Sequence, residues 1–231
     1  MFVKICANTS VEDARLAASL GVDAVGFVFA PSKRRVMPEQ VEQMVRELPA
    51  GLETVGVFAS DDPHEIAGCV RQARLTAAQL HGSFDAGRVR ALDAEFGGGL
   101  KIIQTVTYAV DAADAAEQVG ADERLERTLE SVFDEPAVWA VLIDAARAGA
   151  SGGLGVPFDW ARAARIVQRA VGGREPRPRV ILAGGLRLEN VAQAIKEFRP
   201  WGVDVASGVE AAPGKKDPER LRAFVEAVRG E

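Results

Sequence analysis

Short apolar runs alternate with stretches of helical periodicity along the whole chain. Most of these runs are continuously apolar and rich in β-branched residues, which is typical of parallel strands covered by other elements on both faces. We expect strands at residues 2–6, 24–29, 54–59, 77–80, 101–106, 138–143, 179–183 and 202–206. The sequence therefore predicts eight strands connected by helices.

Capping signals mark several of the helices between these strands. Ser10 and Asp13 form a capping box at the start of one helix, and Gly21 tolerates the left-handed turn that ends it. Asp62-Pro63 and Asp217-Pro218 each place an N-cap before a proline, which lacks only an N–H that the first helical turn does not use. After the second of these pairs, a buried stripe at helical spacing is predicted at Leu221, Phe224, Val225 and Val228.

This βα alternation fits either an open doubly wound sheet or a closed (β/α)₈ barrel. Eight units in 231 residues, without a shift in composition, favour one barrel domain spanning residues 1–231. Three turn-rich or charged stretches interrupt the pattern, at residues 97–99, 121–136 and 172–178. Since a strand resumes after each, we expect them to be loops of the same α/β domain.

Composition excludes several classes of protein. With 48% hydrophobic and 26% charged residues, the chain is neither disordered nor a membrane protein, and no apolar run approaches the ~18 residues needed to cross a bilayer. A net charge of −5 and an isoelectric point near 5.3 argue against nucleic acid as the main partner.

The cysteines and histidines are equally restrictive. Two cysteines give no disulfide framework, and the N-terminus turns polar too soon for a signal peptide, so we expect a cytoplasmic protein. Two histidines, His64 and His81, are not spaced with the cysteines as zinc ligands are, so no metal site is expected. His64 follows Pro63 in a first helical turn and is expected at the surface.

In a barrel of this kind, functional residues follow the carboxyl ends of the strands. Cys6 ends the first predicted strand and Asp144 follows the sixth, so the two could form an acid–base couple. The plainer alternatives are a small buried cysteine and a loop or N-cap aspartate. Cys69 is different, because it shares a helical stripe with Ile66 and Val70 and is expected in the core.

Glycines follow the last two strands. Gly184-Gly185 and Ser207-Gly208 expose backbone N–H groups in adjacent turns, where barrels often bind phosphate. Tight turns without a ligand are the alternative for either pair alone. The segment 152–155 lacks the glycine spacing of a dinucleotide fingerprint.

Five further polar residues lie either at the predicted pocket or at solvated positions. His81 ends the fourth strand and either lines the pocket or is structural. Arg34 and Arg35 follow the second strand, at the expected rim of the pocket, and at least one of them is a solvated charge. The pair Lys215-Lys216 is most simply a solvated pair before the last helix.

Several motifs occur in order along nearly the whole chain, and together they resemble the phosphoribosylanthranilate isomerase family of tryptophan biosynthesis. The residues that carry this resemblance are 4–6, 25–29, 32–34, 55–58, 79–82, 142–144, 158–160, 182–186, 189–191, 203–210 and 213–217. The most specific of them is the run VDVASGVE at residues 203–210, followed by PGKKD.

The resemblance implies a (β/α)₈ isomerase that carries out an Amadori rearrangement of N-(5-phosphoribosyl)anthranilate without metal or organic cofactor. It implies that Asp144 is the general acid and Cys6 the general base. Arg34, with His81 as the next candidate, would bind the anthranilate carboxylate, and Asp204 would also bind substrate. The phosphate would be held by Gly153, Gly184, Gly185, Ser207 and Gly208. A monomer or a homodimer is expected.

The chain departs from the family pattern at several positions. Ala7 stands where glycine is usual, and it would be strained if that position has a positive φ. Leu154, Val156-Pro157 and Ala206 also differ from the usual residues. The rival functions are a non-catalytic phosphosugar-binding barrel and another phosphosugar isomerase of amino-acid biosynthesis. Retention of Cys6 and Asp144 argues against the first, and a cysteine on the first strand does not fit an isomerase that uses two aspartates.

Overall fold

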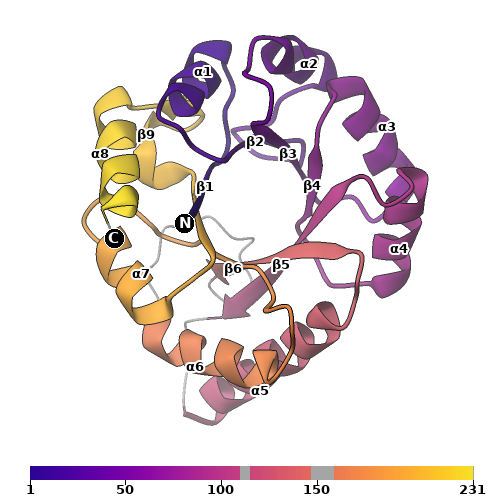
Figure 1. Ribbon diagram of the computed structural model, residues 1–231, viewed down its shortest axis with the longest axis vertical. Helices are drawn as coiled ribbons and strands as arrows, with labels where there is room; N and C mark the ends of the chain where they lie inside the picture. The colour runs from indigo at the N-terminus through magenta and orange to yellow at the C-terminus, as the bar shows by residue number, and fades with distance from the viewer. Residues whose placement is uncertain (110–114, 147–158, 231) are drawn as a thin grey trace.

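The computed structural model describes residues 1–109, 115–146 and 159–230. Eight parallel strands form a closed barrel in the order β1 to β8, and helices surround it as an outer ring (Figure 1). The barrel predicted from the sequence is therefore confirmed, and an open doubly wound sheet is excluded because β1 pairs with β8.

The strands fall where the apolar runs place them. They are β1 (Phe2–Ile5), β2 (Ala24–Val28), β3 (Glu53–Phe58), β4 (Ala77–Leu80), β5 (Lys101–Ala109), β6 (Val138–Ala146), β7 (Val180–Leu182) and β8 (Gly202–Val205). Strands β5 and β6 each extend three residues beyond the predicted end, and they pair along this extension as far as Ala109 and Ala146.

The helices occupy the intervals between strands. They are α1 (Val11–Ser19), α2 (Pro38–Arg46), α3 (Pro63–Ala73), α4 (Ala86–Glu95), α5 (Ala115–Phe133), α6 (Trp160–Val171), α7 (Val191–Phe198) and α8 (Pro218–Arg229). After β8 come a short 3₁₀ turn, η1 (Ser207–Val209), and a small hairpin of β9 (Glu210–Ala212) and β10 (Lys215–Lys216). Among the described residues, no helix is both long and apolar enough to span a membrane.

The N-cap predictions hold, but the capping box at Ser10 is only half formed, because the Asp13 carboxylate accepts the Lys216 N–H and makes no bond back to the Ser10 N–H among the described residues. The Ser10 side chain accepts the Asp13 N–H, and Asp62 and Asp217 accept backbone N–H groups at the starts of α3 and α8. Gly21 has a φ of +71° just past α1. The stripe of α8 predicted from its spacing is buried at all four positions, so this helix packs against the barrel as its sequence indicates.

The prediction that residues 121–136 form a loop is wrong, because most of them belong to α5. A buried stripe on this helix packs into the core, at Ala121, Leu125, Leu129 and Val132. Its charged residues lie on other faces, where Asp122 and Glu126 pair with Arg162 and Arg169 of α6. The high charge density therefore marks the solvated side of an amphipathic helix. The loops predicted at 97–99 and 172–178 are present.

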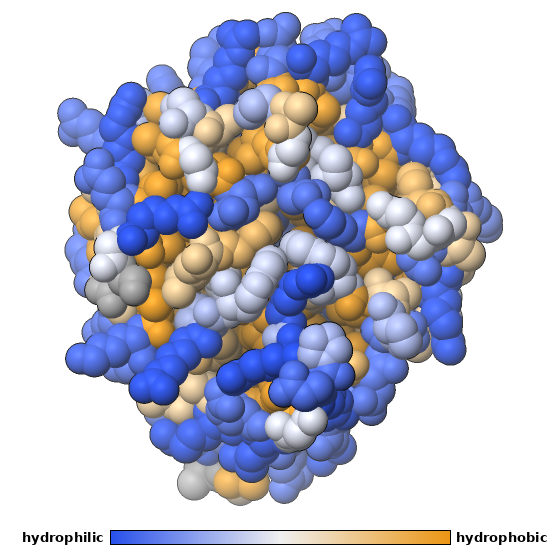
Figure 2. Space-filling model, viewed as in Figure 1, coloured by the Kyte–Doolittle hydropathy of each residue, from blue (hydrophilic) through white to orange (hydrophobic). Residues whose placement is uncertain are grey.

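Strand alternation divides the side chains between two cores. One set faces the helices, and the other fills the barrel interior with residues of modest size: Ala24, Val55, Ala77, Ile103, Ala140, Leu142, Ile181 and Ala183. Phe2, Trp139 and Trp201 pack together at the amino end of the strands, with ring centroids 4.6 Å apart for Phe2 and Trp201. Figure 2 shows hydrophilic residues around the rim of the molecule and apolar residues nearer the middle of the same face.

Two glycines should respond oppositely to an added methyl group. A Cβ at Gly68, on the exposed side of α3, would meet nothing within 4 Å, so Gly68→Ala should raise the free energy of unfolding by about 0.8–1 kcal/mol. A Cβ at Gly208 would lie 2.0 Å from the Leu186 carbonyl oxygen, so Gly208→Ala should lower it by at least about 1 kcal/mol. Urea unfolding measures both. Equal effects of the two substitutions would contradict this packing.

Candidate active site

A cavity of about 260 Å³ opens at the carboxyl ends of the strands. It contains most of the site residues predicted from the sequence, namely Cys6, Arg34, His81, Asp144, Gly184, Gly185, Asp204 and Ser207. Gly208 lines an adjoining pocket together with Gly185 and Ser207. Gly153 lies outside the described residues, as do the departures at Leu154 and Val156-Pro157.

Cys6 is a buried free thiol at the end of β1. Its Sγ lies only 2.8 Å from where a Cβ would stand on Gly26 of β2, so the thiol fits because that position is glycine. Burial raises the pKa of the Cys6 thiol, while the nearby Lys4 ammonium acts in the opposite direction. A second cation, Lys216, also favours the thiolate. The thiol is thus a proton acceptor only when nearby positive charge compensates for burial.

Lys4 precedes Cys6 by two residues along β1, so its side chain points to the same side, into the barrel interior. Its side chain is 0% exposed, and its Nζ donates to Asp204 Oδ1 at 2.9 Å. Burial opposes the charge of Lys4, but the Asp204 carboxylate and Cys6 outweigh it and raise the pKa of Lys4. Lys4 is therefore an ammonium ion inside the barrel, and Asp204 is both its partner and part of the cavity lining.

Asp144 ends the apolar part of β6 and faces the same cavity. Burial is the main reason why its pKa is raised to about 7, and the negative charge of Asp204 adds to the effect, while Lys4 opposes it. Near neutral pH this carboxyl group therefore exists in both protonation states, as a general acid requires. Asp144 and Cys6 differ in chemistry and come from strands far apart around the barrel.

Arg34 is anchored on one edge only. Its Nε and Nη2 donate to the Glu210 carboxylate at 2.9 and 2.7 Å, in the two-point geometry typical of arginine. The edge formed by Nη1 and Nη2 keeps N–H groups for a second carboxylate, since Nη1 has no acceptor among the described residues. Arg34 lines the cavity, whereas Arg35 is exposed and does not. The geometry therefore separates these two neighbours.

The prediction that Lys215-Lys216 is a solvated pair is wrong for Lys216. Lys216 is buried, and its Nζ donates to the carbonyl oxygens of Cys6 at 2.5 Å and Ala206 at 3.2 Å. It also lies 3.5 Å from Glu210 Oε1. The β9–β10 hairpin turns Lys216 inward, and the ammonium then holds together the chain segments that follow β1 and β8.

Ala7 has a φ of +62°, so the strain expected of an alanine at this position is present. Its backbone turns the chain away from β1, and Asn8 stabilises the turn by donating from its side chain to the carbonyl oxygens of Ile5 and Gly26. A left-handed alanine costs about 1–2 kcal/mol, which these contacts must offset. The turn orients Cys6 toward the cavity.

The loops that follow β7 and β8 approach each other closely. Gly184 and Gly185 have φ values of +84° and +65°, and neither N–H has an acceptor among the described residues. Asn190 holds this loop by donating to the Gly185 carbonyl oxygen and by accepting the Arg187 N–H. Successive free N–H groups in such a turn form a concave donor site of the kind that binds anions.

His81 and Gln79 complete one wall of the cavity. Burial lowers the pKa of His81, so its imidazole is neutral at pH 7 and is not a cation for a carboxylate. The Gln79 Nε2 donates to Thr105 Oγ1 at 3.1 Å, while its buried Oε1 has no partner among the described residues. Gln79 is thus a polar group of the cavity that the sequence did not single out.

The residues expected outside the site lie outside it. His64 is exposed and contacts Glu95 at 3.0 Å. Cys69 packs against the hydrophobic core, and its burial raises the pKa of the thiol to about 12. Within the described part of the chain, no group of three His, Cys, Asp or Glu residues could hold a metal ion.

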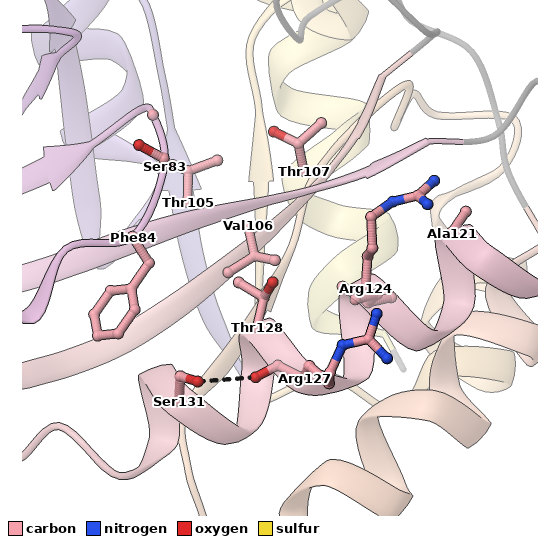
Figure 3. A pocket seen from close by; sticks show the side chains of 12 residues that line it. Ser83, Phe84, Thr105, Val106, Thr107, Ala121, Arg124, Arg127, Thr128 and Ser131 are labelled. Carbon is pink, nitrogen blue, oxygen red and sulfur yellow. Dashed lines mark hydrogen bonds between the residues drawn. The ribbon is translucent and has the colours of Figure 1, made fainter.

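A second cavity of about 580 Å³ lies between the loop after β4, the end of β5 and α5 (Figure 3). Arg124 and Arg127 extend from α5 on one side, and Ser83, Thr105 and Thr107 lie on the other. Arg127 contacts Glu123 of its own helix at 3.4 Å. This cavity contains neither Cys6 nor Asp144, which both line the first one.

Comparison with known proteins agrees with this arrangement. The family model described as "N-(5'phosphoribosyl)anthranilate (PRA) isomerase" matches residues 3–227. The N-(5'-phosphoribosyl)anthranilate isomerase of Rubrobacter xylanophilus is 40% identical over 98% of both chains. The isomerase of Desulforudis audaxviator is 39% identical over 98% of this chain and 97% of its own.

Solved structures show the same fold. Phosphoribosyl anthranilate isomerase from Thermotoga maritima superposes with a TM-score of 0.81 at 33% identity, with both chains fully covered. A phosphoribosyl anthranilate isomerase in complex with reduced 1-(o-carboxyphenylamino)-1-deoxyribulose 5-phosphate has a TM-score of 0.79, 33% identity and the same coverage. A further Thermotoga maritima structure is of monomers generated from a dimeric enzyme, so both states occur among these proteins. The chain belongs to the N-(5'-phosphoribosyl)anthranilate isomerase family.

Proposed function

We propose that this chain isomerises N-(5'-phosphoribosyl)anthranilate to 1-(2-carboxyphenylamino)-1-deoxyribulose 5-phosphate, with Asp144 as general acid and Cys6 as general base. One observation carries the assignment of roles. A carboxyl group with a pKa of about 7 and a thiol near a buried ammonium face one cavity from β6 and β1. A barrel that only binds phosphosugars needs neither group.

The reaction requires four proton transfers, and Asp144 and Cys6 carry out the first two. Asp144 protonates the ring oxygen of the ribose, the C1–O bond breaks, and the nitrogen lone pair forms a C1=N Schiff base. Cys6 then removes the proton from C2, and those electrons form the C1=C2 bond of an enolamine. Reprotonation at C1 and loss of the O2 proton give the ketone. Atoms and electrons balance without a co-reactant, and each acid or base supplies roughly 10²–10⁴-fold in rate.

The two ends of the substrate would be fixed on different parts of the rim. The free N–H groups of Gly184 and Gly185, with Ser207 and Gly208 beside them, suit the phosphate. Arg34 offers its open edge to the anthranilate carboxylate, and Asp204, which lines the same cavity, would also contact the substrate. We propose the same role in phosphate binding for Gly153, which follows β6 in the sequence. The two free cysteines fit the cytoplasm as the proposed location. The proposed assembly is a monomer or a homodimer.

The purified chain should convert the substrate, observed as the decay of anthranilate fluorescence. Asp144→Asn and Cys6→Ala should each reduce kcat by roughly 10²–10⁴-fold, because each removes one proton-transfer group. Cys69→Ala is the matched control, since that thiol is outside the cavity, and it should keep normal turnover. Near-normal turnover of Cys6→Ala would make Cys6 a packing residue and overturn this mechanism.

The pH dependence of kcat/KM should reflect an acid whose pKa lies below that of the base. The active form needs protonated Asp144 and Cys6 thiolate together. Below pH 7 its population grows with pH as the thiolate forms. Above about pH 7 the loss of protonated Asp144 cancels that growth, and the profile becomes level until the thiol itself titrates. A steady decline beginning at pH 7 would instead show a thiolate already formed in acid.

Arg34 and Arg35 should differ strongly in their effect on substrate binding. Arg34→Met should raise KM about ten- to hundredfold, because a charge-assisted hydrogen bond contributes about 1.5–3 kcal/mol. Arg35→Met, with an exposed side chain outside the cavity, should leave KM close to normal. Steady-state kinetics of both variants, with urea unfolding to check the Glu210 contact, tests this. Loss confined to Arg35→Met would refute the assignment.

A further inference from the structure

Lys4 occupies the interior of the barrel directly below Cys6, where the proposed mechanism gives it no task. We propose that the Lys4 ammonium is a positioning residue that holds Cys6 as the thiolate during proton abstraction, and that Asp204 keeps this ammonium in place. The inference rests on the proposed role of Cys6 as the base. It adds a residue whose own contacts, and not contact with substrate, set the reactivity of that base.

The geometry places the ammonium and the thiol around one small space. Residues 4 and 6 of a strand point to the same side, which here is the barrel interior. A Cβ on Gly26 would lie 2.8 Å from Cys6 Sγ and 3.1 Å from Lys4 Nζ, so both atoms border the volume that this glycine leaves open. Lys4 has three N–H donors, and Asp204 Oδ1 accepts one at 2.9 Å. The ammonium therefore retains donors for a second anion.

An ion pair in the interior needs a reason other than stability. Burying a lysine and an aspartate carries a desolvation penalty that their attraction often fails to offset, and apolar residues of similar size are commonly as stable. The neighbouring interior residues are indeed apolar, such as Ala24 and Ile181. A charged pair located below the base is therefore better explained by its effect on that base than by packing.

The charged groups around Cys6 come from several elements, and Lys4 has the leading compensating effect. Asp204 on β8 disfavours the thiolate, but less than the Lys4 charge favours it. Lys216 on β10 favours the thiolate more weakly and is engaged by Glu210 and two carbonyl oxygens. Arg34 is paired with Glu210, His81 is neutral at pH 7, and Asp144 is the proton donor.

The effect of Lys4 on kcat/KM follows from the order of the pKa values of Cys6 and Asp144. Because the base holds its proton more tightly than the acid does, the active form is a minor population at neutral pH. Each unit by which the thiol pKa falls raises that population tenfold. A group that stabilises the thiolate therefore raises kcat/KM directly, without touching the substrate.

The test uses Lys4→Met, which keeps most of the side-chain length and removes the charge, in a Cys69→Ala background that leaves Cys6 as the remaining cysteine. The pH at which iodoacetamide alkylates Cys6 half-maximally should rise by about one unit or more. The level part of the kcat/KM profile should fall about tenfold per unit, and its alkaline limb should move to higher pH by the same amount. Lys101→Met is the matched control, because Lys101 is a barrel-strand lysine that pairs with Glu53 outside this cavity.

Three outcomes separate the possibilities. If Lys4→Met does not fold, Lys4→Met combined with Asp204→Asn removes both charges, and the alkylation midpoint should still rise because Lys4 outweighs Asp204. An unchanged midpoint in a folded variant overturns the inference, as does a loss of kcat/KM without a shift of the alkaline limb. A shifted midpoint in Lys4→Met, together with normal turnover of Cys6→Ala, would refute the role of Cys6 as the base. The interaction between Lys4 and Cys6 would still be supported.

Discussion

Closure of the parallel sheet sends every second side chain of each strand into one shared interior. The strands all run the same way, so their carboxyl ends meet at one end of that interior, and residues distant in sequence face each other there. Cys6 and Asp144 are brought together in this way by β1 and β6. At the amino end of the strands, Phe2, Trp139 and Trp201 pack together.

The charges near the carboxyl ends of the strands form one connected arrangement. Lys4 pairs with Asp204 below Cys6, and Glu210 pairs with Arg34 at the rim. Lys216 joins the two parts, because its ammonium contacts the Cys6 and Ala206 carbonyl oxygens and approaches Glu210. The loop after β2 and the hairpin after β8 are thus fixed to each other and to the end of β1, which lets the rim hold substrate groups in a defined position.

The fold, and the position of Cys6 and Asp144 at one cavity, could be predicted from the sequence because both depend on local pattern. Continuous apolar runs mark buried parallel strands, and a cysteine or aspartate at the end of such a run must lie at the functional face. The helix starts at Asp62-Pro63 and Asp217-Pro218 could likewise be predicted, because each aspartate caps the first turn of the helix that follows it. The strain at Ala7 was expected from the resemblance instead, because glycine is usual at that position, and the positive φ is present.

The residues that support the reacting groups are harder to find because their partners are remote. The burial of Lys216 depends on a hairpin of a few residues and on carbonyl groups of β1 and β8 that no sequence window contains. Glu210 meets Arg34 across 176 positions. The charged stretch 121–136 misled for a different reason. Its apolar stripe at Ala121, Leu125, Leu129 and Val132 has helical spacing, but the many charged residues between these positions mask that pattern.

Burial raises the pKa of both Asp144 and Cys6, the two groups proposed to react. In the proposed mechanism this helps the acid and hinders the base. The raised pKa of Asp144 keeps the acid protonated where it is needed. The raised pKa of Cys6 withholds the base. A single dry cavity therefore cannot prepare both groups by desolvation alone. The remedy must be a charge that acts more strongly on one than on the other. Lys4 is so placed, because it borders the same glycine gap as the Cys6 thiol, whereas at Asp144 its influence comes after that of burial and Asp204.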